Sequence, residues 1–543
     1  MQTLNHSRHE ALWGSQGQDI IRNSSVLVVG SDNLAVEVLK SITTLGVENI
    51  SIVSNERVKK DFFFLDKIIP KGKSKVSGLE SCLKECFNSM ANIKSYNSLA
   101  SNSLLTSLDY DLIIDTTNNL TSQNISYNMA KVKNAGLLTI AAGLNHREID
   151  FYNQELRPNA NPVIKGYDGL NQGIIISNLF AGMAVEEARK FLFKRNIDKF
   201  TEPITRYIER PEEVEQNNNS PFKEIEYKNI VKTDLILKKR IFHDLSAKPF
   251  LNRVRKIEDY KIEETPVLYL DNPKILIAGA GSLGNFAGIM LSNMSKGELH
   301  FVDFDSFETS NNVRQYLAYD SDKYSIDKRF KTHIIVDKLS KINPNLRLQS
   351  IVGYVGSELN ESILKKTGLN KSEITLINSD WIAKQNYDAI LGCFDRRSAR
   401  FDLSDFAYET NTPYIDAGSG AEPTNGAIKT FIPGKNKHTL SKDFNFSGFI
   451  PDPKKVNQEL IDHINTQRSA GRLTNGQEFY VPGQGCGSEY NPGSLSMGNQ
   501  VAASLMISEL RRIINPNIYG DKIVKSVKYS SDLSKRLEVM AWA

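Results

Sequence analysis

The same order of segments occurs twice in this chain, and this duplication most restricts its fold. Residues 23–58 (NSSVLVVGSDNLAVEVLKSITTLGVENISIVSNERV) run as an apolar strand, a turn, a helix and an alternating strand. Residues 272–307 (NPKILIAGAGSLGNFAGIMLSNMSKGELHFVDFDSF) repeat that order. The separation is far too long for a solenoid repeat and indicates a duplicated domain.

Later segments continue the duplication in the same order. Residues 109–144 match residues 386–421, and residues 172–193 match residues 493–514 as the closing helix of each copy. Any two α/β domains resemble each other locally, but several matches in one order favour duplication. Alternating strands and helices predict the α/β class, with two tandem Rossmann-like domains.

Domain boundaries follow from this repeat. We expect a first domain over residues 1–198, a linker region over 199–270 and a second domain over 271–543. The linker is rich in charged and polar residues, and its EEVEQNNNS stretch has the composition of a solvated loop. A long crossover loop is expected at about 435–485 of the second domain.

Composition excludes several classes of protein. The hydrophobic fraction of 40% and charged fraction of 24% are those of a soluble globular protein. No stretch is apolar enough for a membrane helix, and the amino terminus lacks a signal-peptide core, so we expect a cytoplasmic protein. A net charge of +4 over 543 residues gives no nucleic-acid footprint.

A glycine-rich turn in the second copy points to a nucleotide. Gly279, Gly281 and Gly284 have GxGxxG spacing between an apolar strand and a helix, and Asp303 ends the next strand. Glycine lets the backbone approach phosphate at a helix amino terminus, while an acid at that strand end accepts hydrogen bonds from ribose hydroxyls. The turn alone is weak evidence, and Asp303 strengthens it.

Polar residues beyond that strand favour ATP over a dinucleotide. Asn311, Arg314 and Gln315 follow the strand, and Lys331 begins an amphipathic helix. Each cation alone is most simply a solvated surface charge. Together, behind a ribose acid, they suit a longer and more highly charged polyphosphate than the one in NAD.

The first copy lacks these features. Its turn, GSDNLA, keeps Gly30 alone, and Ser54 stands where the second copy has Asp303. Asn118 likewise replaces Asp395. The first copy is therefore expected to keep the fold and to have lost the site.

These ordered motifs resemble the ubiquitin-activating-enzyme superfamily, which includes the MoeB and ThiF adenylyltransferases. The second copy carries GAGSLG, DFD, SNNVRQ and CFDRRSAR in the order of that family, and HSRHEALWGSQGQ in the first copy is similar to its YxRQxRLWGxxGQ opening. The resemblance covers most of the chain outside the linker. It implies that ATP and magnesium are bound and that the carboxy-terminal glycine of a small β-grasp protein is adenylated.

The resemblance also implies roles for single residues. Asp303 would hold the ribose, Asp305 would belong to the same nucleotide-binding set, and the phosphates would be held by Asn311, Arg314, Gln315 and Lys331. Asp395 would help to hold magnesium and orient the attacking carboxylate. Arg8 matches an arginine that reaches across a dimer interface to the partner's ATP, so the chain would be a fused pseudo-dimer with one active centre.

Three departures from the family pattern limit this transfer. Arg396 stands where the family usually has asparagine, and Ser282 replaces a turn glycine. The four cysteines, Cys82, Cys86, Cys393 and Cys486, include no CxxC pair. Neither a disulfide framework nor the family's structural zinc is therefore predicted.

Cys486 leaves the chemistry after adenylation open. It lies in VPGQGCGSEYNPG, near a position where some family members use a cysteine to take the acyl group. Glycines around it favour an exposed thiol of lowered pKa, but most free cysteines behave as small buried hydrophobes. We interpret Cys393, Cys82 and Cys86 as core residues.

Three functions follow from these motifs. The leading one is adenylation of a ubiquitin-like or sulfur-carrier protein that ends in glycine, with any conjugating enzyme a separate chain. The second is adenylation of a peptide carboxylate in the maturation of a peptide natural product. The third is a catalytically silent nucleotide-binding scaffold, against which the intact motifs of the second copy argue.

Overall fold

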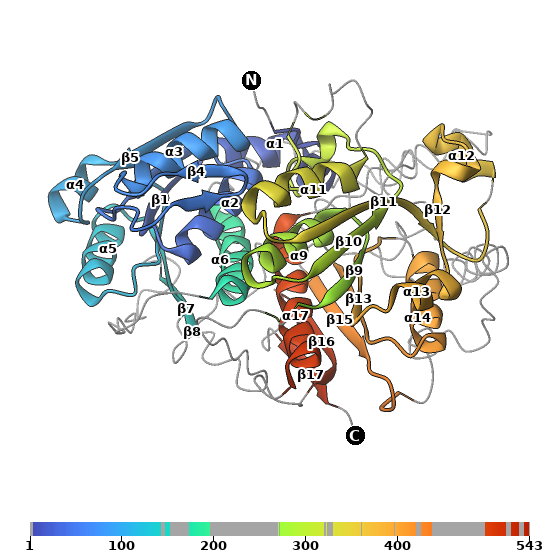
Figure 1. The fold of residues 1–543 in the computed structure, drawn as a ribbon. Helices are drawn as coiled ribbons and strands as arrows, with labels where there is room; N and C mark the ends of the chain where they lie inside the picture. Colours follow the sequence, from blue (N-terminus) through green and yellow to red (C-terminus); the bar gives the residue numbers. More distant parts are fainter. Residues whose placement is uncertain are drawn as a thin grey trace, which may run out of the picture.

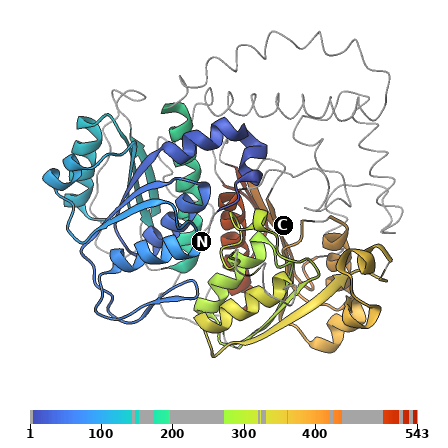
Figure 2. The ribbon, with the colours of Figure 1, turned by 90° about the horizontal axis from the view of Figure 1, so that it is seen from above.

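The two copies form two α/β units that lie side by side (Figures 1 and 2). In the computed structural model the described residues are 4–142, 147–152, 173–195, 270, 272–319, 322, 330–359, 361–395, 397–419, 425–436, 495–516, 523–530 and 537–541. Residues 199–269 of the expected linker, residues 437–485 of the expected crossover loop, Arg396 and Cys486 lie outside these ranges. Across the described helices, none is both long and apolar enough to span a bilayer.

The first copy is built on a six-stranded sheet in its described part. In spatial order its strands are β5 (Asn92–Tyr96), β2 (Asn49–Val53), β1 (Ser25–Val29), β6 (Leu112–Asp115), β7 (Gly136–Ala142) and β8 (Arg147–Tyr152). Neighbours from β5 to β7 are parallel, and β8 is antiparallel to β7. A separate hairpin joins β3 (Phe62–Phe64) and β4 (Lys67–Ile69).

The second copy has a larger sheet, of nine strands among its described residues. Their spatial order is β12 (Thr375–Ile377), β11 (Arg347–Val355), β10 (Glu298–Asp303), β9 (Lys274–Ala278), β13 (Ala389–Gly392), β14 (Tyr414–Ser419), β15 (Asn425–Phe431), β16 (Val524–Ser530) and β17 (Leu537–Ala541). The strands from β12 to β14 are parallel, and β15 to β17 continue as antiparallel strands.

Helices connect and cover these strands. In the first copy they are α1 (Ser7–Asn23), α2 (Asn33–Leu45), α3 (Lys75–Cys86), α4 (Asn102–Ser107), α5 (Leu120–Val132) and α6 (Ile174–Arg195). In the second copy they are α9 (Ser282–Met294), the 3-10 turns η2 (Thr309–Asn311) and η3 (Lys371–Glu373), α11 (Lys331–Ile342), α12 (Glu361–Thr367), α13 (Ser379–Gln385), α14 (Arg397–Glu409) and α17 (Ser496–Ile514).

The strand order confirms the duplicated Rossmann-like fold. The order β5, β2, β1, β6, β7, β8 in the first copy recurs as β11, β10, β9, β13, β14, β15 in the second. The register recurs as well, since Ser25 pairs with Asn49 where Lys274 pairs with Glu298. Equivalent positions in the two copies are therefore fixed by strand pairing.

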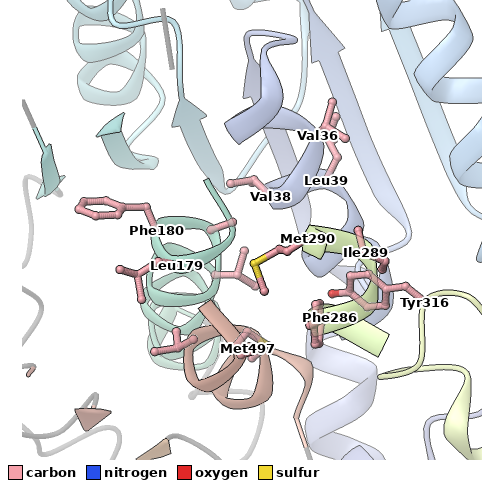
Figure 3. Close-up of a cluster of buried hydrophobic side chains, with 14 of the residues drawn as sticks. Val36, Val38, Leu39, Leu179, Phe180, Phe286, Ile289, Met290, Tyr316 and Met497 are labelled. Atoms are coloured by element: carbon pink, nitrogen blue, oxygen red, sulfur yellow. The ribbon is translucent and has the colours of Figure 1, made fainter. Parts of the chain in front are cut away.

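Apolar helices join the copies into an intramolecular pseudo-dimer. Figure 3 shows Val36, Val38 and Leu39 of α2 and Leu179 and Phe180 of α6 in one cluster with second-copy residues; these are Phe286, Ile289, Met290, Tyr316 and Met497. All ten are buried. Because residues of both copies belong to one buried cluster, the two copies share one core. Full burial of a Val, Leu, Ile, Phe or Met side chain contributes about 1.5–3 kcal/mol.

Buried polar contacts fix the alignment of the closing helices. The Gln500 side chain in α17 donates to the Asn178 Oδ1 of α6 at 3.0 Å and accepts from the Ser41 hydroxyl of α2 at 2.9 Å. Buried polar groups need partners, so these bonds favour one alignment of α6, α17 and α2.

Candidate functional site

The glycine-rich turn of the second copy lies between β9 and α9. Gly279 has φ +113, and a Cβ there would lie 2.7 Å from the backbone of Cys393, which directly follows the neighbouring strand β13. A Cβ on Gly284 would lie 2.0 Å from the carbonyl oxygen of Gly279. Both positions therefore require glycine for the turn to close.

Gly281 differs because its surroundings are open. It is the N-cap residue of α9, and a Cβ there would meet no described atom within 4 Å. Within the described residues no side chain caps this helix end. The first backbone N–H groups of a helix bind anions well, so the turn offers a phosphate site.

Asp303 is held rigidly at the end of β10, next to this turn. Its carboxylate accepts from the backbone N–H of Ala280 at 2.8 Å and from that of Asp305 at 2.9 Å. Burial, followed by the charge of Asp305, raises the pKa of Asp303, while Lys331 opposes the shift. The carboxylate is thus oriented beside the turn, where a ribose hydroxyl would donate to it.

Lys331 contacts Asp305, two residues beyond Asp303. It begins α11, as expected, and its Nζ is 3.2 Å from Asp305 Oδ2. The backbone N–H of Lys331 also donates to the carbonyl oxygen of Asp305 at 2.9 Å. Asp305 therefore fixes the start of α11 against the end of β10.

Asn311 organises the segment that follows β10. Its Oδ1 accepts from the guanidinium of Arg314 at 3.3 Å and from the amide of Gln315 at 2.9 Å. All three side chains are buried. Ser282 donates its hydroxyl to the carbonyl oxygen of Arg314 at 2.9 Å, so the residue that replaces a family glycine ties the turn to this segment.

The first copy reaches this segment through its amino-terminal helix. The backbone N–H of Asn5 donates to Asn312 Oδ1 at 3.0 Å. Burial lowers the pKa of His9 well below its ordinary value, and the charge of Arg314 is among the smaller causes. Arg8, between these contacts on α1, is 2% exposed. The structure therefore brings the Arg8 region of one copy to the Arg314 region of the other.

Asp395 follows β13 and is exposed, unlike Cys393 before it. Burial raises the pKa of the Cys393 thiol well above its ordinary value, as suits a core residue. Beyond Asp395, Arg400 of α14 forms an ion pair with Asp416 of β14, which sequence reasoning did not single out. This pair anchors the helix that begins next to Asp395.

The first copy is filled by its own side chains at the equivalent positions. Strand register makes Ser54 the equivalent of Asp303 and Asn118 the equivalent of Asp395, as the repeat predicts. Asp32 stands where Gly281 does, and its carboxylate accepts from the backbone N–H of Ala35 at 2.8 Å to cap α2. The helix end that is open in the second copy is closed here by a protein carboxylate.

One family profile, described as the ThiF family, matches residues 6–146 and 255–539 of this chain. The chain belongs to the ThiF family. The two matched regions correspond to the two copies, so both carry the ThiF pattern although their turns differ.

Curated relatives of this ThiF-family chain match part of it. It is 24% identical over 209 residues to ubiquitin-like modifier-activating enzyme 5 of Dictyostelium discoideum, covering 35% of this chain and 50% of that one. It is 27% identical over 228 residues to adenylyltransferase and sulfurtransferase UBA4 of Kluyveromyces lactis, covering 40% and 46%. The chain thus spans about half the length of these relatives.

A solved structure of E. coli MccB with ATP also resembles this chain. Sequence identity is 20% and the TM-score is 0.33, over 60% of this chain and 83% of that one. Similarity at this level carries no argument about a substrate.

One further equivalence between the two copies of this ThiF-family chain is not visible in its sequence motifs. Lys75 begins α3 as Lys331 begins α11, and its Nζ is 3.7 Å from Glu56 Oε2, where Lys331 pairs with Asp305. Matching bridges, Arg57 with Ser74 and Ser306 with Phe330, establish the equivalence. The intervening loops differ in length, which hides Lys75 from a linear alignment.

In the described part of the chain, no region brings together three or more His, Cys, Asp or Glu side chains in a metal-binding arrangement. A carboxylate oxygen from Asp395 suits magnesium, which commonly takes one or two carboxylates together with substrate phosphates.

Proposed function

We propose that this chain uses ATP to adenylate the carboxy-terminal glycine of a ubiquitin-like or sulfur-carrier protein. The observation that carries the proposal is the open amino terminus of α9 at Gly281, beside the oriented carboxylate of Asp303. Family membership and the names of the two curated relatives support it. The same fold without the site occurs in the first copy, so the fold alone does not account for these features.

Different groups of the site would hold the ribose and the phosphates of ATP. Asp303 would accept from the ribose hydroxyls, and the amides of α9 would receive a phosphate. Arg314, Lys331 and Arg8 would face the remaining negative charge, with Asn311 and Gln315 supporting them. Magnesium, held by the phosphates and Asp395, would neutralise further phosphate charge.

The reaction needs no protein nucleophile. A carboxylate oxygen of the substrate attacks the α-phosphorus, and the bond from that phosphorus to the bridging oxygen of the β-phosphate breaks. The products are an acyl adenylate and pyrophosphate. Attacking group and target are both anionic, so cations fixed around the phosphates lower the barrier, and orientation supplies much of the rest.

Cys486 enters as the proposed acceptor of the activated acyl group. A thiolate would attack the acyl carbon and expel AMP, leaving a thioester on Cys486. The acyl group would then pass to a separate conjugating or sulfur-transferring protein. Without such a thiol, the adenylate itself would be the product delivered.

Exchange of labelled pyrophosphate into ATP tests the proposal. Incubation with a ubiquitin-like protein ending in glycine is expected to produce exchange, and Arg8→Ala is expected to lower its rate about a hundredfold because a cation at the phosphates is lost. Exchange with a peptide carboxylate alone would support peptide maturation instead. Absence of exchange with every carboxylate, despite ATP binding, would support a silent scaffold.

A thiol-sensitive adduct tests the second step separately. Wild-type protein is expected to form a covalent adduct with the carrier that hydroxylamine or excess thiol releases. Cys486→Ala should retain pyrophosphate exchange and form no adduct. An adduct that persists in Cys486→Ala would remove Cys486 from the mechanism and leave adenylation intact.

A further inference from the structure

A hairpin of the first copy makes contacts that the nucleotide site itself does not explain. Strands β3 and β4 pair Phe64 with Lys67 around the two-residue turn Leu65–Asp66. Leu65 has φ +53, a conformation that L-residues other than Asn and Asp rarely adopt, yet its side chain is only 3% exposed. A strained turn held by burial points to a function for the residue at its tip.

Asp66, at that tip, bridges two segments of the second copy. One carboxylate oxygen accepts from the hydroxyl of Tyr319, and the other lies 3.2 Å from Nζ of Lys338. The side chains of Lys338 and Asp66 are 8% and 6% exposed. The ammonium group of Lys338 also lies 3.9 Å from the centre of the Tyr319 ring, and Asp322 Oδ1 lies 4.0 Å from Nζ.

These partners belong to the segments that carry the candidate phosphate ligands. Tyr319 closes the stretch that begins with Asn311 and contains Arg314. Lys338 is in α11, two turns beyond Lys331. Burial alone would raise the pKa of Asp66, but the Tyr319 hydroxyl and the charge of Lys338 outweigh it and lower that pKa. Asp66 therefore carries its charge at neutral pH and binds both segments.

We infer that Asp66 of the first copy is a positioning residue that sets Lys331 relative to Arg314 in the nucleotide site of the second copy. This inference rests on the proposed function. A single buried carboxylate that accepts from both segments couples them, since a shift of either segment leaves the buried charge of Asp66 with one partner fewer. The aromatic contacts Phe64–Phe87, Phe87–Tyr316 and Tyr316–Phe286 support the same face across the boundary between the copies.

Asp66→Asn tests the inference, with Glu80→Gln as the matched control. Asn keeps the shape of Asp66 and removes the charge that receives Lys338. Glu80 accepts from Ser95 and Lys84 within the first copy. Glu80→Gln therefore also removes the charge of a hydrogen-bonded carboxylate, but one whose partners lie in the first copy. Tyr319→Phe, which removes only the donated hydroxyl, is the second variant.

Two measurements on the full-length chain are made for each variant. Asp66→Asn and Tyr319→Phe are expected to speed hydrogen exchange in peptides covering 311–319 and 331–338, and to weaken binding of a non-hydrolysable ATP analogue about tenfold. The double variant should lose little more affinity for the ATP analogue than either single variant does. Glu80→Gln should change neither measurement, whatever its effect on the melting temperature.

The outcomes separate this inference from the proposed function. Unchanged hydrogen exchange and unchanged ATP affinity in Asp66→Asn would overturn the positioning role and leave the proposed adenylation untouched. If hydrogen exchange rises as expected in Asp66→Asn but the wild-type protein binds no ATP, the proposed nucleotide site is wrong, and the inference that rests on it is overturned as well. Equal losses of affinity in Asp66→Asn and Glu80→Gln would reduce Asp66 to a stabilising residue and also overturn it.

Discussion

The turn after β1 and the turn after β9 occupy the same place in their sheets but leave their helix ends in opposite states. In the first copy the Asp32 carboxylate caps the amino terminus of α2 by accepting from the backbone N–H of Ala35. In the second copy Gly281 leaves the amino terminus of α9 open. An internal carboxylate and a bound phosphate satisfy the same backbone groups, so one turn stabilises its own helix while the other is suited to a ligand.

The ribose position shows the same difference. In the second copy Asp303 is oriented by two backbone N–H groups. In the first copy Ser31, Ser54 and Glu56 bond to one another, with Ser31 Oγ 2.9 Å from Ser54 Oγ and 2.8 Å from Glu56 Oε2. In the first copy these side chains therefore bond to one another, and that copy also supplies contacts such as those of Asn5 and Asp66 to the second copy.

Gly281→Asp is expected to have the largest effect, because it copies the closed turn into the open one. Gly281 has φ −78, which any residue adopts, and open space for a Cβ, so the fold should hold. The new carboxylate would cap α9 and repel phosphate, weakening ATP binding more than about a hundredfold. Titration calorimetry measures the affinity, and thermal melting should show equal or slightly raised stability.

Gly281→Asn is the control for this change. Asn caps a helix as well as Asp does but carries no charge, so its loss of affinity should be smaller, about tenfold. Wild-type ATP affinity in Gly281→Asp would contradict the assignment of phosphate to the amino terminus of α9.

Asp303→Ser, which copies Ser54 into the second copy, is expected to have the next largest effect. Hydrogen bonds to a charged acceptor contribute about 1.5–3 kcal/mol, so ATP affinity should fall about thirtyfold. For 2′-deoxy-ATP, the difference in affinity between the wild-type protein and the variant should be smaller than it is for ATP. An equal loss for both nucleotides would mean that Asp303 does not contact the 2′-hydroxyl of the ribose.

Sequence reasoning reached the parts of this comparison that are local. Gly279, Asp303 and the start of α11 at Lys331 are fixed by strand ends and short motifs, and strand register confirms the matches to Ser54 and Asn118. The cap made by Asp32 was missed because GSDNLA was judged by the glycines it lacks. Asp66 carries no motif, and its partners are 253 and 272 residues away, so only the folded chain brings them together.

Acidification tests the supporting role of α1, with an expected effect of about 1 kcal/mol. Burial, followed by the charge of Arg22, lowers the pKa of His6 to about 4. An unfolded histidine takes a proton below about 6.5 while buried His6 stays neutral, so its contribution is complete above that pH and declines below it. Between about pH 7 and 5.5, the free energy of unfolding of the wild-type protein should therefore fall by about 1 kcal/mol more than that of His6→Asn. Urea denaturation at each pH measures both values. Equal slopes would show that His6 is accessible to protons in the folded chain.

Asp32→Gly is expected to have the smallest effect, and it asks whether an open turn is sufficient for binding. Exchanging a capping Asp for Gly costs only a few tenths of a kcal/mol, so the melting temperature should hardly change. ATP binding should remain at one site per chain, because Ser31, Ser54 and Glu56 still fill the ribose position and Glu56 adds negative charge. Calorimetric stoichiometry, with Gly281→Asp introduced to silence the second copy, isolates any new site. A second bound ATP in Asp32→Gly would show that the capping carboxylate of Asp32 alone prevents the first copy from binding ATP. It would also show that Ser31 and Ser54 move to admit a nucleotide.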